Sequence, residues 1–324
     1  MQKILVIRFS SIGDIVLTSP ILRCLKVQVD CEIHYITKKA NAIVLEANPH
    51  IDKIITIENE IDEVSKAMKT ENYDFVIDLH HNLRSLRLRK ALKRPSAAFP
   101  KLNRQKLLYT KFKRRNVMPD IHIVDRYFAA ANSLGLINDN QGLEYFIPEG
   151  AEVNLADHNI KPDFIAFAIG AQFATKRLPN NKIIELIKKS DQQMVLLGGP
   201  TDVESANEIA KACPNAVNLV GKLDWHQSAS IIQQSARVIT HDTGMMHIAA
   251  AFKKPIAAIW GNTTPQLGMY PYLPQNPELF ENHEVELSCR PCSKIGYQKC
   301  PKKHFKCMND QDLEAILNPP HGIQ

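Results

Sequence analysis

No apolar stretch in this 324-residue sequence approaches the roughly 18 to 20 residues that a helix needs to cross a bilayer. The first residues, Met1-Gln2-Lys3, run directly into a strand-like segment that Arg8 interrupts, so the apolar core of a secretory signal is missing as well. Internal repeats and low-complexity tracts are also absent, which excludes repeat architectures. We therefore expect a cytoplasmic globular protein, with length enough for two domains that each have a core.

The glycine pattern of a dinucleotide-binding enzyme is absent. Such an enzyme would carry GxGxxG after its first strand, where glycines allow the backbone to approach a pyrophosphate. The corresponding loop here, residues 9–14 (FSSIGD), supplies only one of those three glycines. A dinucleotide-dependent oxidoreductase is thereby excluded.

Acidic residues are absent from residues 84–115, which hold thirteen Lys and Arg. This basic tract accounts for the net charge of +6, and the rest of the chain is net negative. Leucines and aromatic residues are interleaved with the charges, which favours contact with an anionic membrane surface or a polyanionic acceptor over nucleic acid. A solvated helix face is the alternative. The candidate acceptor-binding residues are Arg84, Arg87, Lys111 and Arg114.

Short apolar runs alternate with helical patterns along most of the chain, which predicts parallel sheets in an α/β fold. In the first half we expect strands at 3–9, 31–36, 53–57 and 73–79, and helices at 14–27, 40–47, 61–70 and 122–134. A polar stretch at 138–161 reads as a linker. Beyond it we expect strands at 164–169, 193–197, 216–220, 237–240 and 255–260, and helices at 181–190, 201–213, 225–235 and 245–252.

This alternation predicts two Rossmann-like domains whose parallel sheets face each other across a cleft. The first would span residues 1–150, with the basic tract at 84–115 as an insertion. The second would span 151–310 and include a cysteine-rich end, and 311–324 would form a tail.

Residues 238–265 form the most informative stretch, because they read as a strand, a tight turn, a helix, a second strand and a second turn. Thr243 is a good helix N-cap, and Gly244 leaves room for a ligand to approach the backbone. A helix N-terminus at the carboxyl end of a parallel strand suits a phosphate. Asp242 and His247 lie near the same end, and the small, hydroxyl-bearing loop 261–265 ends the neighbouring strand. Together they predict an anion site.

Three motifs resemble those of the family 9 glycosyltransferases, the heptosyltransferases. They are residues 8–14 (RFSSIGD) followed by Pro20, residues 242–265 (DTGMMHIAAAFKKPIAAIWGNTTP), and residues 170–179 together with a cysteine-bearing C-terminus. The resemblance implies a GT-B enzyme that moves heptose from ADP-L-glycero-D-manno-heptose to the lipopolysaccharide inner core, with inversion. It also implies a lipid A-core-type acceptor and peripheral work at the cytoplasmic face of the inner membrane.

The same resemblance suggests roles for individual residues. Asp14 becomes the candidate base for the acceptor hydroxyl, although a first-turn helix acid favoured by the dipole is the plainer interpretation. Lys176 becomes the cation for the diphosphate, with a solvent-facing loop lysine as the alternative. Asp202 is a candidate for the ribose hydroxyls, which a first-turn helix acid explains equally well. Asp242 would hold sugar hydroxyls, and Thr243, Gly244 and His247 the phosphates.

Because a lysine and a helix dipole can neutralise the diphosphate, we expect no cofactor and no metal to be required for catalysis. Four cysteines fall within nineteen residues, and disulfides are rare in the cytoplasm. We expect reduced thiols that order a C-terminal cap. The alternative is a structural zinc held by Cys289, Cys292, Cys300 and Cys307, with His304 as a spare ligand.

Two further functions stay open at this point. One keeps the family and changes the nucleotide sugar. The other is a zinc-containing nucleic-acid-binding protein that would use the basic tract and the cysteine cluster, but it leaves residues 238–265 without a purpose.

Overall fold

The computed structural model describes residues 1–318 and divides the chain into two compact units. The first unit contains Met1–Leu102 and Ile121–Pro148, and the second contains Asn103–Asp120 with the described residues from Glu149 on. The boundary near residue 150 thus falls two residues earlier than expected. The basic tract was expected to be an insertion in the first unit. The structure instead divides it after Leu102, and its second half belongs to the second unit.

The first unit is built on a five-stranded sheet in which every neighbouring pair of strands is parallel. Its order is β3 (Lys53–Ile57), β2 (Cys31–Lys38), β1 (Gln2–Ile7), β4 (Phe75–Asp78) and β5 (Ser96–Ala98). Ile4, Leu5, Val6 and Ile7 of the central strand are completely buried. Such a continuous apolar run is typical of a parallel strand that is covered on both faces.

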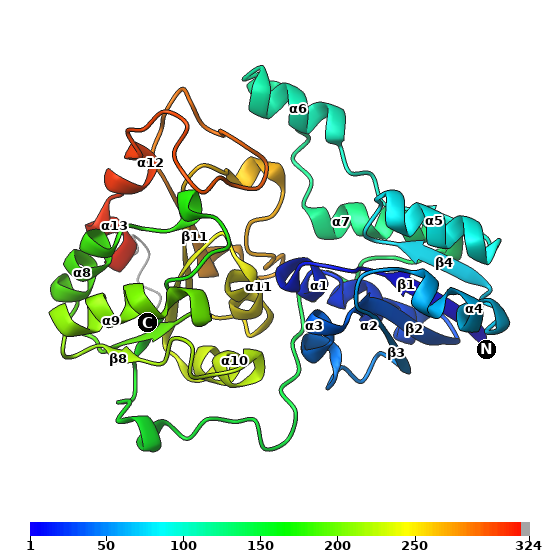
Figure 1. Ribbon diagram of the computed structural model, residues 1–324, viewed down its shortest axis with the longest axis horizontal. Coiled ribbons are helices and arrows are strands. Elements are labelled where there is room, and N and C mark those ends of the chain that lie inside the picture. The colour runs from blue at the N-terminus through cyan, green and yellow to red at the C-terminus, as the bar shows by residue number, and fades with distance from the viewer. Residues whose placement is uncertain (319–324) are drawn as a thin grey trace. The chain divides into compact units, whose positions relative to one another are not determined.

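The helices of the first unit are shorter than their sequence patterns suggest (α1 to α5 are blue to cyan and α7 is teal-green in Figure 1). The helix expected over 14–27 is two helices, α1 (Ile12–Val16) and α2 (Ser19–Gln28), because Pro20 has no N–H to continue a helix. The remaining helices are α3 (Lys39–Ala42), η1 (Ile43–Leu45), α4 (Asp62–Thr70), α5 (Leu83–Leu92), α7 (Ile123–Phe128) and η3 (Ala129–Leu134).

The second unit contains a six-stranded sheet, again with parallel neighbours throughout. Its order is β11 (Phe280–Glu284), β10 (Ile256–Trp260), β9 (Arg237–His241), β6 (Ile165–Ala168), β7 (Met194–Leu197) and β8 (Val217–Asn218). Strand β11 was not expected from the sequence. Its residues are only partly buried or exposed, so it carries no apolar pattern.

The second unit contains the four expected helices and two further groups of helices that the sequence did not predict. The expected ones are α8 (Asn180–Lys189), α9 (Val203–Ala212), α10 (Trp225–Gln234) and α11 (Gly244–Ala251). The additions are α6 (Asn103–Lys111) with η2 (Arg115–Val117), and α12 (Lys306–Asn309) with α13 (Leu313–Leu317). Single 3-10 turns are η4 (Leu155–His158), η5 (Ala174–Lys176), η6 (Pro200–Asp202), η7 (Pro265–Leu267) and η8 (Pro277–Leu279).

The expected tail at 311–324 is wrong in its described part. Leu313 and Ile316 of α13 are buried in the core of the second unit, and Lys189 of α8 pairs with Glu314 at 2.5 Å. Residues 319–324 of that tail lie outside the described residues.

Each sheet has one place where the direction of strand addition reverses. In the first unit it lies between β1 and β4, and in the second between β6 and β9. Ligands of open parallel sheets bind outside the carboxyl ends of strands at such points. The loops that follow these four strands are therefore where functional residues should be sought. Across residues 1–318, none of the helices combines the length and apolarity that crossing a bilayer demands.

Candidate functional site

Three side chains meet at the carboxyl ends of β6, β9 and β10 in the second unit. Lys176 Nζ lies 2.6 Å from Asp242 Oδ2 and also donates to the Asp242 carbonyl at 3.1 Å. Thr263 Oγ1 donates to the same Oδ2 atom at 2.8 Å. The side chains of Lys176 and Asp242 are 15% and 11% exposed, respectively. A cation and an anion are thus held together at the sheet's reversal point, where an incoming anion would compete with Asp242 for the lysine.

Helix α11 begins directly after this aspartate. Thr243 occupies the N-cap position as expected, but its side chain does not accept a hydrogen bond from the helix. Its Oγ1 atom lies 3.4 Å from Thr240 Oγ1 instead. The positive end of the helix therefore lies beside Asp242, with Gly244 as its first residue. His247, expected near a phosphate, is only 2% exposed and presents almost no surface to a ligand.

Asp202 is not part of this group. Its Oδ2 atom accepts the Gly199 N–H at 3.0 Å, and its Oδ1 atom pairs with Arg177 at 3.2 Å. A Cβ atom on Gly170 would lie 2.1 Å from Oδ2, so the glycine is needed for this close approach. Asp202 thus has the contacts of a first-turn helix acid, one of the two interpretations that the sequence left open.

His241, the last residue of β9, holds the lysine-bearing loop and was not singled out by the sequence. It is completely buried, and its Nε2 atom accepts the Leu178 N–H at 3.0 Å. Burial lowers the pKa of His241 to about 4, so the ring is neutral near pH 7 and can act as this acceptor. A histidine at the buried end of a strand, directly before Asp242, was the available signal.

In the first unit, the loop after β1 presents Asp14 at the first turn of α1. Asp14 Oδ1 lies 2.6 Å from Arg8 Nη2, and Oδ2 accepts from Ser11 Oγ at 2.9 Å. Arg8 is buried and also donates to the Leu79 carbonyl, which follows β4, at 2.5 Å. The carboxylate is therefore oriented by direct contacts with Arg8 and Ser11 and lies at the reversal point of its own sheet. This geometry fits both a capping acid and an oriented base.

His80 follows β4 at the same edge of the first sheet. Its ring packs edge-on against Phe9 with a centroid separation of 5.1 Å. Burial, with the positive charge of Arg8, lowers the pKa of His80 to about 3. The structure thus places a neutral imidazole close to the Arg8–Asp14 pair.

The four basic acceptor candidates are not assembled within one unit. Arg84 and Arg87 lie on α5 of the first unit, and the Arg84 guanidinium carbon is 5.9 Å from the centre of the Phe9 ring. Lys111, at the end of α6, and Arg114 belong to the second unit. The tract is therefore two helices separated by β5, not one continuous amphipathic segment.

Large apolar side chains on and beside both helices are nevertheless exposed. The exposed fractions are 76% for Leu83, 51% for Leu107 and 59% for Phe112. Tyr109 is the buried exception on α6, and its hydroxyl lies 2.9 Å from Thr264 Oγ1 in the loop after β10. This contact accounts for the membership of α6 in the second unit.

The cysteine-rich end contains thiols and no disulfide within the described residues. Cys289 Sγ lies 3.7 Å from His304 Nε2, and Cys292 Sγ donates to the Cys289 carbonyl at 3.2 Å. Burial raises the pKa of the thiols of Cys292 and Cys307 to about 11 and about 12. Within residues 1–318, no three His, Cys, Asp or Glu side chains are arranged to hold a metal. The zinc ligand set is thus not assembled.

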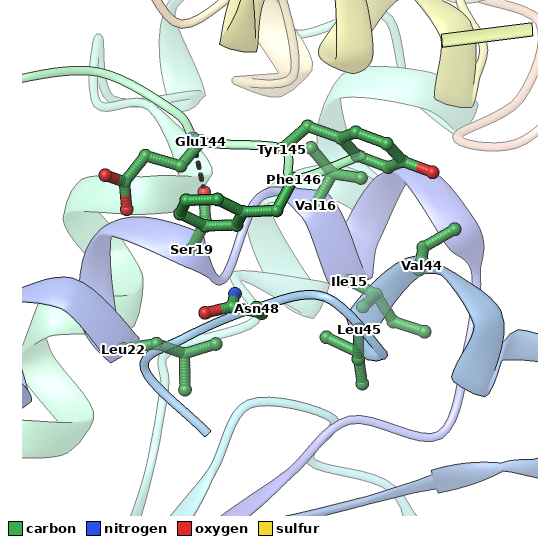
Figure 2. Close-up of a pocket in the computed structure, with 10 residues that line it drawn as sticks. All are labelled: Ile15, Val16, Ser19, Leu22, Val44, Leu45, Asn48, Glu144, Tyr145 and Phe146. Atoms are coloured by element: carbon green, nitrogen blue, oxygen red, sulfur yellow. Dashed lines mark hydrogen bonds between the residues drawn. The ribbon is translucent and has the colours of Figure 1, made fainter. Parts of the chain in front are cut away.

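A pocket in the first unit is lined by none of the candidate site residues described above (Figure 2). Side chains from α1, α2 and η1 line it together with Asn48 and the stretch from Glu144 to Phe146. Ser19 Oγ accepts the Glu144 N–H at 2.9 Å, as Figure 2 shows. Asp14 is not among the lining residues, and most of the lining is apolar.

Comparison with curated proteins finds similarity to bacterial heptosyltransferases. Lipooligosaccharide heptosyltransferase 2 of Haemophilus influenzae is 35% identical over 111 residues, which are 32% of each chain. Lipopolysaccharide heptosyltransferase 2 of Escherichia coli K12 is 30% identical over 162 residues, 44% of this chain and 47% of the relative. The aligned stretches thus span about a third to a half of these relatives.

The fold is also that of a solved structure, E. coli ADP-heptose LPS heptosyltransferase II. The TM-score is 0.68 at 21% identity, and the superposition covers 98% of both chains. This likeness confirms the expected α/β GT-B class with two Rossmann-like units of parallel strands. The profile of glycosyltransferase family 9 (heptosyltransferase) matches residues 61–300, and the chain belongs to that family.

Proposed function

We propose that the protein is an inverting glycosyltransferase that moves a heptose from ADP-L-glycero-D-manno-heptose to the lipopolysaccharide inner core. Family membership and the names of the two curated relatives support heptosyl transfer, and the structural neighbour from E. coli is named for ADP-heptose. The observation that carries the proposal is the Lys176–Asp242 pair, 2.6 Å apart, beside the N-terminus of α11.

Donor binding is assigned to the second unit. The diphosphate would take the Lys176 ammonium from Asp242 and accept hydrogen bonds from the first amides of α11. Asp242, released from the lysine, would accept hydroxyl hydrogens of the sugar. Because the ammonium and the helix dipole both stabilise the negative charge of the departing ADP, the proposal needs no catalytic divalent metal.

Proton abstraction is assigned to Asp14. Its carboxylate would take the proton of the acceptor hydroxyl while that oxygen forms a bond to the anomeric carbon. The bond from that carbon to the diphosphate oxygen breaks on the opposite face, its electron pair leaves with ADP, and the configuration inverts. Arg8 and Ser11 would hold Asp14 in position through the contacts of 2.6 and 2.9 Å.

The acceptor would be a lipid A-core-type molecule at the cytoplasmic face of the inner membrane. Its phosphates suit the cations of α5 and α6, and the exposed Leu83, Leu107 and Phe112 suit the adjoining lipid. A nucleic-acid partner is not proposed, because binding nucleic acid would give the Lys176–Asp242 pair no role.

Calorimetric titration with ADP, ADP-heptose, UDP-sugars and GDP-sugars tests the donor assignment. We expect ADP and ADP-heptose to bind, and UDP-sugars and GDP-sugars not to bind. If a UDP- or GDP-sugar binds and no adenine nucleotide does, the family assignment holds but the heptosyl donor is wrong. Product analysis with ADP-heptose and a heptose-deficient lipopolysaccharide then tests the transfer itself.

A further inference from the structure

A buried arginine in the cysteine-rich region contacts the loop that carries Thr263. Arg290 is 6% exposed, and its Nε atom donates to the Gly261 carbonyl at 2.6 Å. Its Nη2 atom donates to the Thr263 carbonyl at 2.9 Å and to the Trp260 carbonyl at 3.3 Å. A single guanidinium thus binds three carbonyls at the end of β10, a pattern that needs a planar fork of donors.

The other side of the same guanidinium is anchored at the end of β11. Arg290 Nη1 donates to the Val285 carbonyl at 2.7 Å, and Nη2 pairs with Glu284 Oε2 at 2.9 Å. The backbone next to Arg290 is held as well, since Cys292 N–H donates to the Asn262 carbonyl at 2.9 Å. Arg290 therefore connects the loop after β10 to the neighbouring strand.

The same region also holds the loop that carries Lys176. Tyr297 N–H donates to Thr175 Oγ1 at 2.8 Å, and Thr175 N–H donates to the Tyr297 carbonyl at 3.0 Å. Thr175 Oγ1 in turn donates to Asn262 Oδ1 at 2.9 Å, which joins the two loops. A Cβ atom on Gly261 would lie 2.3 Å from the Thr175 carbonyl, so the loops are in close contact.

We propose that Arg290 is a positioning residue for the donor site, acting through Thr263. Its bond to the Thr263 carbonyl fixes the residue whose hydroxyl binds Asp242, and thereby sets where Asp242 stands relative to Lys176. Arg290 itself touches no substrate. This inference rests on the proposed function, because it assigns residues 289–298 to the support of the nucleotide-sugar site.

Arg290→Lys tests the proposal, since lysine keeps the charge and loses the planar fork. Arg237→Lys is the matched control. Arg237 also donates to a backbone carbonyl in the second unit, that of Leu317 at 2.7 Å, but it begins β9 at the opposite end from Asp242. We expect the affinity for ADP-heptose, whose sugar Asp242 would hold, to fall at least about tenfold in Arg290→Lys and to stay unchanged in Arg237→Lys, since small displacements of binding groups are costly.

Amide hydrogen exchange on the same proteins gives a second measurement that needs no nucleotide. We expect faster exchange at residues 261–264 and 174–177 in Arg290→Lys only. If both variants weaken ADP-heptose binding in proportion to their loss of thermal stability, with no local change in exchange, Arg290 is merely structural and the proposal is overturned.

Thr263→Val keeps the arginine and removes only the hydroxyl, so it serves if Arg290→Lys does not fold. We expect it to weaken ADP-heptose binding to a similar extent, and an unchanged affinity for ADP-heptose would refute the route through Thr263. A parent protein that binds no ADP contradicts the proposed function instead. The exchange measurement would then still decide whether Arg290 positions the two loops.

Discussion

Lys176 Nζ and Asp242 Oδ2 lie 2.6 Å apart across the point where strand addition reverses in the second sheet. The two residues are 66 positions apart in the chain, and both side chains are mostly buried. A partly buried ion pair is costly to break by removing one partner, but either partner can be taken over by a ligand of the right charge. In the proposed donor site, a diphosphate would therefore replace Asp242 as the ionic partner of Lys176.

Lys176→Ala should weaken ADP binding by about tenfold to a hundredfold, because a charge-assisted contact to the diphosphate is lost. Lys182→Ala is the control, since Lys182 belongs to the same unit and pairs with a neighbour on its own helix, Glu185, at 2.9 Å. Calorimetric titration of both variants measures the difference. Equal ADP affinities in the two proteins would contradict the assignment of Lys176.

Asp242→Asn should have different effects on the binding of the nucleotide and on the transfer of the sugar. Because the substitution removes the charge that holds Lys176, ADP should bind at least as tightly as to the parent protein. Transfer from ADP-heptose should nevertheless fall, since the contact to the sugar hydroxyls is weakened. Titration with ADP and steady-state kinetics with ADP-heptose test the two parts, and weaker ADP binding would show that Asp242 has another role.

Asp14→Asn should lower kcat by about a hundredfold to ten-thousandfold while ADP affinity stays unchanged, because the base is lost and the proposed donor contacts in the second unit are kept. Asp62→Asn provides the control, since Asp62 is likewise an acid in the first turn of a helix of the first unit. If both substitutions cost only stability and leave kcat intact, Asp14 is a helix acid and the base must be sought elsewhere.

Stability should fall as the pH drops from about 6.5 toward 4, because burial lowers the pKa of His241 from 6.5 to about 4 in the folded protein. Between these values the unfolded chain binds more protons, so the stabilisation is complete above 6.5 and is lost on acidification. The loss of folding free energy that is due to His241 over this pH range is about 3 kcal/mol. The pKa of His80 and that of His283 are lowered in the same direction.

Urea unfolding at pH 7.5 and pH 5 measures this effect. His241→Gln should reduce the pH dependence, since glutamine can still accept the Leu178 N–H but does not titrate. His158→Gln, at a partly exposed histidine of η4, is the control. If the free energy of unfolding changes with pH in His241→Gln as it does in the parent protein, other titrating groups account for the pH dependence.

Charge reversal of the basic candidates should raise the acceptor KM and weaken binding to anionic liposomes, with ADP affinity intact. Two double variants test the two units separately, Arg84→Glu with Arg87→Glu on α5, and Lys111→Glu with Arg114→Glu in the second unit. Reversal of Lys66 and Lys69 on α4 is the control. If acceptor kinetics and liposome binding are the same in all three proteins, the tract is an ordinary solvated surface.

The sheets and the loops of the site were predictable wherever an apolar run met a polar turn. Strand β3 has the expected bounds, and residues 237–260 fold as the expected strand, helix and strand. Asp242 and Thr243 therefore lie where their sequence context places them. Strands β5 and β11 were missed, because one has three residues and the other is polar and only half-buried.

Local pattern by itself thus determined the α/β class, the alternation of the buried strands with helices, and the strand ends at which Asp14 and Asp242 lie. These follow from burial, because a strand covered on both faces must be apolar and its loop must be polar. The tertiary structure decided which side chains pair. Lys176 with Asp242, Arg290 with the Thr263 carbonyl, and Tyr109 with Thr264 join residues distant in sequence. Such contacts depend on strand order and on side-chain geometry, which neither periodicity nor composition records.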